Sequence, residues 1–394
     1  MDHRRRPEMT WPYAGMTVPP GWRPTPLREF VLKVHQRCNL ACDYCYVYEL
    51  ADQSWRDRPV MMSRAVGQAT AARIAEHAHR HRLTQVRAVL HGGEPLLAGP
   101  ARLAELVGDL RATLPTIMIG TQTNGVLLTE RMLAVLAAHR VSVGISLDGL
   151  TADHDRHRRH RSGAGSSAAA ERALTLLRSD AYRSSYAGLL CTVDPRTDPV
   201  ATYEALVSHR PPAIDLLLPH ATWAAPPPAG RYADWLIAVF DRWYPAGSRE
   251  TSIRLFDEII TLVLGGASRS DQVGLSPAVV AVVESDGAIE QVDSLKSAYP
   301  GACATGLNVL DHDFDEVLRH PGIVARQIGR AALADGCLAC PVHTVCGAGH
   351  YAHRYRPGAG FRQPSVYCAD LRRLIGHIGR RVTGDLRVLA RSQP

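Results

Sequence analysis

The sequence predicts an α/β protein built on a parallel sheet, and two observations support this fold class. Apolar runs of strand length alternate with longer segments whose apolar residues recur at helical spacing. Polar or glycine-containing motifs follow several of these runs, at the points where strands would end. Six strand–helix units in succession favour a parallel sheet with helices outside it, either doubly wound or barrel-like.

The predicted elements alternate regularly along the chain. Strands are expected at Phe30–Val34, Val86–Leu90, Ile117–Ile119, Val141–Ile145, Ala187–Val193 and Ile214–Leu218. Helices are expected at Met62–Ala78, Ala101–Ala112, Glu130–Ala138, Ala168–Leu177, Tyr232–Trp243 and Ile253–Leu264. Because the carboxyl ends of parallel strands lie on one face of such a fold, the motifs after the first four strands are expected to converge.

A change of pattern near residue 270 divides the chain. Val279–Glu284 and Ile289–Val292 flank an Asp-Gly turn signal, which indicates a hairpin, and clustered cysteines follow. The first residues are rich in Pro, Arg and Trp and lack periodicity. We therefore predict an irregular arm over 1–27, an α/β domain over 28–269 and a cysteine-bearing domain over 270–394.

Composition limits the possible locations and partners. No apolar run approaches the ~20 residues that span a bilayer, and no apolar segment follows the basic N-terminus, so we expect a cytoplasmic protein with no membrane partner. The formal net charge is +7, but no nucleic-acid-binding motif is visible, so no nucleic acid is expected. The densest basic run, residues 154–161, is predicted to be a solvated loop with one functional arginine. Lysine occurs only as Lys33 and Lys296, which we attribute to genome composition.

Three cysteines follow the first predicted strand. Cys38, Cys42 and Cys45 form a C-x3-C-x2-C run, and cysteines in a chain without an export signal indicate metal ligation more than disulfides. Iron–sulfur clusters normally take four thiolates, so a group of three leaves one iron open. The alternatives are a zinc site, for which three cysteines are too few to close a tetrahedron, and a disulfide pair.

A second cysteine group lies in the predicted C-terminal domain. Cys337, Cys340 and Cys346 form a C-x2-C-x5-C run, and Cys368 follows at a distance. Four thiolates make a closed set, suited to a cluster that binds no substrate or to a four-cysteine zinc site. Cys191, within an apolar stretch, is predicted to be a plain buried thiol.

Together with the strand-end motifs, the first cysteine run resembles the signature of the radical S-adenosylmethionine (SAM) enzymes. Those motifs are Gly92-Gly93-Glu94-Pro95, Thr123-Asn124-Gly125, and Ser146 with Asp148. The resemblance implies a partial (β/α)6 TIM-like barrel and a [4Fe–4S] cluster with an open iron that SAM chelates. Cleavage of SAM in this family gives a 5′-deoxyadenosyl radical.

The resemblance also implies which residues contact SAM. These are Tyr44, Gly92, Gly93, Glu94, Pro95, Thr123, Asn124, Ser146, Arg158 and Leu217. Taken alone, the Gly-Gly and Asn-Gly pairs are equally consistent with turns, and Arg158 with a salt-bridged surface arginine.

The second cysteine group then resembles the SPASM extension of radical SAM enzymes, whose auxiliary [4Fe–4S] cluster uses four cysteines in this pattern. A full SPASM domain holds two auxiliary clusters, but this chain has Val292, Asp311 and His350 where further cysteines are expected. We therefore predict one auxiliary cluster, held by Cys337, Cys340, Cys346 and Cys368.

Longer phrases over residues 28–375 resemble the Fxs-type radical SAM/SPASM peptide maturases. They include Leu216-Leu-Leu-Pro-His220 and Gln291-Val-Asp293-Ser-Leu-Lys296. This resemblance implies a precursor peptide as substrate, an aromatic ring joined to a β-carbon as product (a cyclophane), and an electron donor such as flavodoxin or ferredoxin. Thioether formation, epimerisation and formylglycine formation are the alternatives.

Rearomatisation of the ring requires a base. Asp293 is the first candidate, followed by His220 and Asp148. A hydrogen-bonded turn carboxylate is an equally good interpretation of Asp293, and His350 and His353 are expected to be structural.

Overall fold

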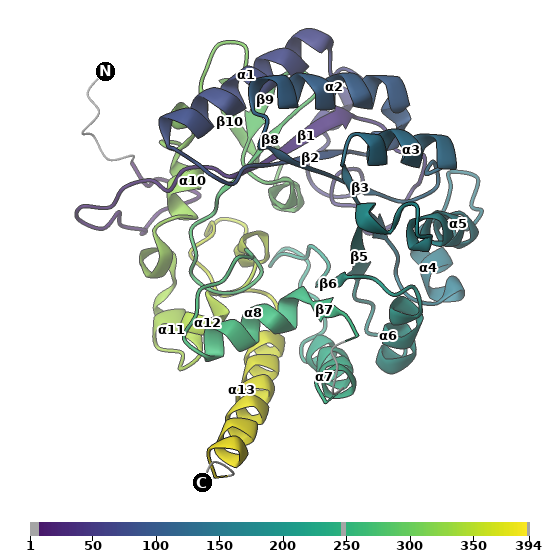
Figure 1. Ribbon diagram of the computed structural model, residues 1–394. Coiled ribbons are helices and arrows are strands. Elements are labelled where there is room, and N and C mark those ends of the chain that lie inside the picture. The colour runs from purple at the N-terminus through teal and green to yellow at the C-terminus, as the bar shows by residue number, and fades with distance from the viewer. Residues whose placement is uncertain (1–7, 246–249, 392–394) are drawn as a thin grey trace.

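The computed structural model describes residues 8–245 and 250–391, and its centre is a ten-stranded sheet (Figure 1). Six adjacent strands run parallel and in chain order: β1 (Glu29–His35), β2 (Arg87–Gly92), β3 (Met118–Thr123), β4 (Ser142–Ser146), β5 (Tyr186–Thr192) and β6 (Ala213–Leu217). The short strand β7 (Ser252–Ile253) pairs with β6 at one edge. The predicted fold class, a TIM-like partial barrel, is confirmed.

Helices connect the strands and cover the outer face of the sheet (Figure 1). They are α1 (Arg64–Arg80), α2 (Pro100–Thr113), α3 (Glu130–Ala138), α4 (Thr151–His157), α5 (Ser167–Arg178), α6 (Pro199–Ser208), α7 (Arg231–Trp243) and α8 (Arg254–Val263). Ser63, Thr129 and Asp198 begin α1, α3 and α6, and each side chain accepts a hydrogen bond from a backbone N–H of the first turn. Every predicted helix is present, with bounds shifted by a few residues.

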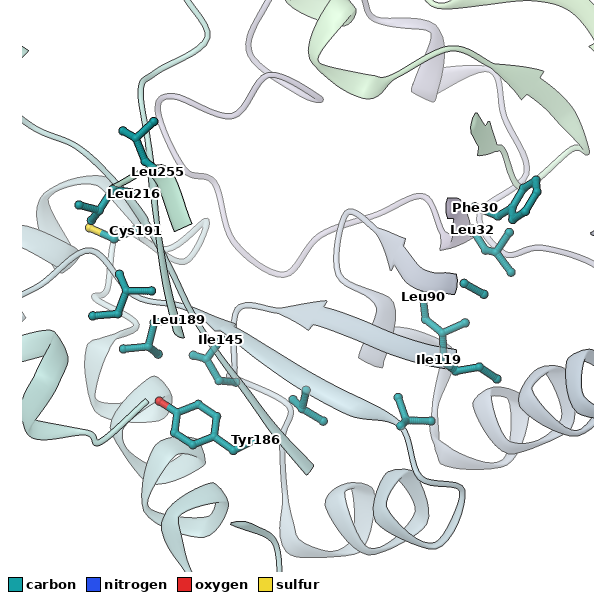
Figure 2. Packing of buried hydrophobic residues seen from close by; sticks show 14 of the residues in the cluster. Phe30, Leu32, Leu90, Ile119, Ile145, Tyr186, Leu189, Cys191, Leu216 and Leu255 are labelled. Atoms are coloured by element: carbon teal, nitrogen blue, oxygen red, sulfur yellow. The ribbon is translucent and has the colours of Figure 1, made fainter. Parts of the chain in front are cut away.

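The apolar strand residues form the core between sheet and helices. Figure 2 shows Phe30, Leu90 and Ile145 among the side chains packed there, and all three are fully buried. Cys191 lies in the same layer and is buried, so the prediction of a plain buried thiol is confirmed. Burial of this kind contributes roughly 1.5–3 kcal/mol per large apolar side chain.

The C-terminal part joins the sheet rather than standing apart from it. The predicted hairpin consists of β8 (Val280–Val283) and β9 (Ala288–Glu290), and β10 (Ala304–Asn308) pairs with β9. Strand β8 also runs parallel to β1 and pairs with it, so the hairpin extends the barrel sheet beyond its first strand.

Short helices follow β10 and lead to a long terminal helix. They are α9 (Phe314–Val317), α10 (Pro321–Ala325), α11 (Asp335–Leu338) and α12 (His343–Cys346), and the last is α13 (Cys368–Arg391). Helix α13 packs against α7 and α8, next to the opposite edge of the sheet. The part after residue 270 therefore contacts both ends of the parallel sheet, and we call it the extension.

The predicted arm is irregular where the structure describes it, and residues 1–7 lie outside the described residues. Tyr13 stacks on Phe361 with ring centroids 5.9 Å apart, so the arm packs on the extension. Among the residues described, no helix is both long and apolar enough to cross a membrane.

One local prediction is wrong. The basic run over 154–161 is not a solvated loop throughout, because its first residues form the end of α4 and Arg158 is buried. The helix is anchored by His154, whose Nδ1 accepts the backbone N–H of Asp148 and whose Nε2 lies 3.0 Å from Ser166 Oγ. A charged sequence run thus folds inward because one histidine has buried partners.

Candidate functional site

The carboxyl ends of the parallel strands surround a cavity of about 200 Å³, which we call the strand-end pocket. Its walls include these predicted residues: Cys38, Cys42, Tyr44, Cys45, Gly92, Gly93, Glu94, Thr123, Asn124, Ser146, Arg158, Leu217 and His220. Pro95, Asp148 and Asp293 are not among the lining residues. The fold therefore brings together all three N-terminal cysteines and nearly all the predicted cofactor contacts.

The three cysteines lie in the loop after β1 as free thiols. Burial raises the pKa of Cys38 to about 12 and that of Cys42 to about 11. Backbone N–H groups of Leu40, and of Val47 and Tyr48, donate to Cys38 and Cys45 respectively. Such thiols stay protonated by themselves, whereas a coordinated metal deprotonates them, so the loop is suited to hold a cationic group.

Gly92 at the end of β2 and Gly93 directly after it permit the close approach of the cysteine loop. Gly92 has φ +152°, and a Cβ there would lie 2.1 Å from the His35 carbonyl oxygen. A Cβ on Gly93 would lie 1.8 Å from the Tyr48 hydroxyl. Both positions need glycine because backbone and side chain of the β1 segment already occupy the space.

Glu94 fastens the end of β2 to the end of β3. Its carboxylate accepts hydrogen bonds from the Thr123 hydroxyl at 2.7 Å and from the backbone N–H of Asn124 at 2.9 Å. Asn124 in turn donates to Asn39 Oδ1 at 2.8 Å, within the cysteine loop. Burial raises the pKa of Glu94 above its ordinary value, although these donors oppose the shift. The network fixes three strand ends relative to one another.

Arg158 is buried at the pocket and paired with Asp148. Its Nε lies 2.8 Å from Asp148 Oδ2, and its guanidinium carbon lies 5.4 Å from the Tyr44 ring centroid. Asp148 also accepts the Tyr44 hydroxyl and the backbone N–H of Thr192. Burial acts to raise the pKa of Asp148, but Arg158 and the hydrogen bonds lower it overall. Asp148 is thus an ionised partner of Arg158 and lies outside the pocket wall.

A larger cavity of about 850 Å³ lies between β6 and the extension. It shares Tyr46, Leu217, Leu218 and His220 with the strand-end pocket, so the two cavities adjoin. Arg326, His350, Tyr351, His353 and Arg354 line it from the extension.

Asp293 lies in a buried ion-pair network behind this cavity. The Nζ atom of Lys33 is 2.5 Å from its Oδ2, and that of Lys296 is 3.2 Å from its Oδ1. Lys296 also contacts Glu284 at 2.5 Å and Glu290 at 3.3 Å. We call these five residues the seam network, because Lys33 is on β1 and the others belong to the extension. Sequence reasoning missed it, although a chain with only two lysines offered a signal.

The C-terminal cysteines also converge. Cys337 is in α11, Cys346 ends α12, and Cys368 begins α13. Burial raises the pKa of Cys346 to about 11, and the nearby Cys368 and Cys337 thiols add to the shift. Cys340 contributes in the same way to the raised pKa of Cys368. The four thiols therefore form one group, as the sequence pattern predicts.

A parallel α/β barrel with three convergent cysteines at its strand ends defines the class of the protein: an iron–sulfur enzyme with a cofactor pocket on the open face. Residues 32–197 match the model of the Radical SAM superfamily, and the chain is a radical SAM enzyme. This family uses a [4Fe–4S] cluster and SAM.

The chain is also similar to several known proteins. The chain is 26% identical over 285 residues to a cysteine-type anaerobic sulfatase-maturating enzyme of Clostridium perfringens, covering 68% of this chain and 74% of that one. It is 33% identical over 141 residues to a serine-type enzyme of Bacteroides thetaiotaomicron, covering 35% and 33%. The solved structure of native anSMEcpe with bound AdoMet and Cp18Cys peptide shares the fold, with TM-score 0.78 and 22% identity over 92% of this chain and all of that one.

Proposed function

We propose that the protein matures a ribosomally made precursor peptide by joining an aromatic ring to a β-carbon. The observation that carries the peptide substrate is the cavity of about 850 Å³ that adjoins the strand-end pocket and offers room for several residues beside the cofactor. The relatives are named as sulfatase-maturating enzymes, and one related structure contains a peptide together with AdoMet. The cross-link itself is proposed from the resemblance of residues 28–375 to the Fxs-type maturases.

The residues of the strand-end pocket fit a cluster and SAM. Cys38, Cys42 and Cys45 would hold the [4Fe–4S] cluster and leave one iron open. The pocket wall offers an acidic group in Glu94 and a guanidinium in Arg158, which complement the amino and carboxylate groups of SAM. When bound, the cluster and SAM supply a radical that removes one hydrogen atom from the substrate, and an auxiliary cluster supplies an electron acceptor.

The C-terminal cysteines fit one auxiliary [4Fe–4S] cluster. Among the described residues, no group of three or more metal-binding atoms within 4.8 Å of one another contains a cysteine. A single zinc ion with Zn–S bonds of about 2.3 Å would hold its thiolates about 3.8 Å apart. No three of the thiols of Cys337, Cys340, Cys346 and Cys368 are within 4.8 Å of one another, which favours the larger cubane over a single zinc ion.

The chain itself has to remove one proton. Once a substrate carbon radical has added to the ring, rearomatisation releases one electron and one proton, so the product lacks two hydrogen atoms overall. Asp293 is our proposed base: its neighbour Ser294 lines the large cavity, and Lys33 and Lys296 keep it ionised. The released proton is acidic, so a weak base suffices.

Cluster content is the first test. Anaerobic reconstitution is expected to give iron and labile sulfide for two cubanes per chain. The triple variant C38A/C42A/C45A should retain one cubane, as should the pair C346A/C368A, while the control C191A retains both. Zinc without labile sulfide in the wild-type protein would rule out the proposal.

Incubation with SAM, a reductant and a short peptide encoded beside the gene tests the reaction. A cross-link removes two hydrogen atoms and creates no aldehyde, and fragment ions between the joined residues should be missing. The named relatives are sulfatase-maturating enzymes, so protein maturation of another kind is the second candidate. Formylglycine formation, one of the alternatives, gives an aldehyde that reacts with a hydrazide. A hydrazide-reactive product would replace cross-linking by this second candidate function.

A further inference from the structure

Three histidines converge in the large cavity, away from both cysteine groups. His220 follows β6, and His350 and His353 belong to the extension. One ring nitrogen of each lies within 4.8 Å of the others. All three residues line the cavity.

Each histidine has a buried ring nitrogen with no hydrogen-bond partner. These atoms are His220 Nδ1, His350 Nδ1 and His353 Nε2, and His353 is only 3% exposed. An unpaired buried polar atom costs about 1–3 kcal/mol. Each of the three histidines therefore offers an unpaired nitrogen at the wall of one cavity, which suits a ligand better than apolar packing.

The other ring nitrogen of His350 has a carboxylate partner. His350 Nε2 lies 3.4 Å from Asp271 Oδ2, and Arg326 Nη2 lies 3.8 Å from the same oxygen. Histidines that bind metals usually donate their second N–H to a carboxylate, which orients the ring. This contact occupies Nε2 of His350 and leaves its buried Nδ1 without a partner.

The protonation of the rings is compatible with ligation. Burial lowers the pKa of His220 to about 3 and places that of His353 well below the ordinary value. Neutral imidazole is the form that binds a metal ion.

Another histidine group in the same chain provides a contrast. His77, His81 and Asp315 also bring ligand atoms together, but His77 Nε2 accepts the backbone N–H of Leu27 at 3.0 Å. The remaining nitrogens bond Asp315, His77 Nδ1 at 2.7 Å and His81 Nε2 at 2.8 Å. That group is satisfied internally, whereas the cavity histidines are not.

We propose that His220, His350 and His353 form a site for one divalent transition metal ion, with zinc as the representative ion. Imidazole ligands suit zinc, iron, nickel and copper. Three protein ligands leave at least one coordination position open, and it faces the cavity. An oxygen of a molecule in the cavity would complete the coordination. The site does not depend on the proposed peptide reaction.

Zinc binding by the reconstituted holoenzyme tests the proposal. After anaerobic dialysis against a chelator, the protein is titrated with Zn²⁺, and zinc per chain is measured beside iron and sulfide. We expect one zinc per chain, with X-ray absorption showing only nitrogen and oxygen neighbours at about 2.0–2.1 Å. Failure to bind zinc stoichiometrically, or sulfur neighbours from the cysteine groups, would overturn the proposal.

Variants locate the ion. H350A and H353A should each weaken zinc binding at least 10-fold, and D271N about 10- to 100-fold through the orientation of His350. H81A, from the satisfied group, is the matched control and should bind zinc as the wild type does. Unchanged zinc affinity in both H350A and H353A contradicts the site. If H350A or H353A also loses iron, its weaker zinc binding does not locate the ion. The zinc affinity of H220A and the X-ray absorption spectrum of the wild-type protein then test the site.

Discussion

Two buried ion-pair networks, one at the strand-end pocket and one between β1 and the extension, are built in different ways. At the strand-end pocket, Arg158 pairs with Asp148 ten residues earlier in the chain. In the seam network, Lys33 of β1 meets Asp293 of the extension. The first pair joins the ends of neighbouring segments, whereas the second exists only when the extension is docked on the barrel. A local pair can serve a cofactor pocket, while a long-range network couples docking to the position of the proposed base.

The seam network is also the more heavily charged of the two. Lys33 and Lys296 are almost completely buried and face Glu284, Glu290 and Asp293. Arg58 adds a further cation, 2.6 Å from Glu290. Burial acts to raise the pKa of Asp293, but the two lysines lower it overall. Such a network tolerates the loss of a cation poorly, because an unpaired buried carboxylate remains.

Removal of the central cation should have the largest effect on stability. Lys296→Met leaves the buried carboxylates of Glu284 and Asp293 with fewer counter-ions, and the expected loss is about 3–5 kcal/mol in the free energy of unfolding. Anaerobic urea denaturation followed by circular dichroism measures it. Arg373→Met, which breaks the exposed pair with Asp234, is the control and should cost at most about 1 kcal/mol. A similar small loss in K296M would show that the seam network does not hold the extension.

Neutralising the proposed base should affect turnover most. Asp293→Asn removes the group that accepts the proton, so product formation should fall about 100-fold or more. Formation of 5′-deoxyadenosine and the cluster content should change little, because the strand-end pocket is untouched. Asp286→Asn, in the turn of the β8–β9 hairpin and partly exposed, serves as the control. Normal cross-linking by D293N would show that Asp293 is not the base.

Changing the local pair should weaken cofactor binding by a smaller factor. Arg158→Gln removes the guanidinium from the strand-end pocket and leaves Asp148 with two donors, so SAM binding should weaken about 10- to 100-fold, or roughly 1.5–3 kcal/mol. Arg158→Lys should recover only part of this, since it lacks the planar fork. Equilibrium dialysis of SAM with reconstituted protein gives both values. SAM affinity unchanged in R158Q would assign Arg158 a purely structural role.

The contrast between a local pair and a long-range network also separates the features that the sequence predicts from those it does not. Strand ends, the glycine pair and the cysteine runs are local patterns, because their partners follow from the order of parallel strands. The seam network and the histidine group combine residues from β1, β6 and the extension, and no spacing rule connects them. The genome composition accounts for few lysines, yet it does not explain why both lie in one buried network.

Local patterns also do not report how a polar group is satisfied. Asp148 is a candidate base in the sequence, but its contacts with Arg158, Tyr44 and Thr192 depend on the burial of α4. His350 is visible as a replacement for a cysteine, whereas its neighbours His220 and His353 become evident only in three dimensions.

The smallest predicted effect is on the pH dependence of the free energy of unfolding. Each network has one histidine next to it, so the two networks can be compared in this way. His91 Nδ1 lies 3.4 Å from Lys33 Nζ, and His154 supports the segment of Arg158. Burial first, and the adjacent cation second, lower the pKa of each histidine to about 4. The unfolded chain, with histidine pKa values near 6.5, therefore binds more protons than the folded chain between these pH values.

The sign of the pH dependence follows from this difference. The stabilising contribution is complete above about pH 6.5 and is lost as the pH falls toward 4, by about 1.4 kcal/mol per pH unit for each histidine. His91→Asn should remove one such slope at the seam, and His154→Gln one at the pocket. Urea denaturation at several pH values separates them. If the two substitutions remove equal slopes, both histidines exclude protons to the same extent. The local and the long-range network then differ only in how they are assembled. If only H154Q loses a slope, His91 takes up protons in the folded protein as easily as in the unfolded chain. This result would mean that water reaches His91 through the cavity.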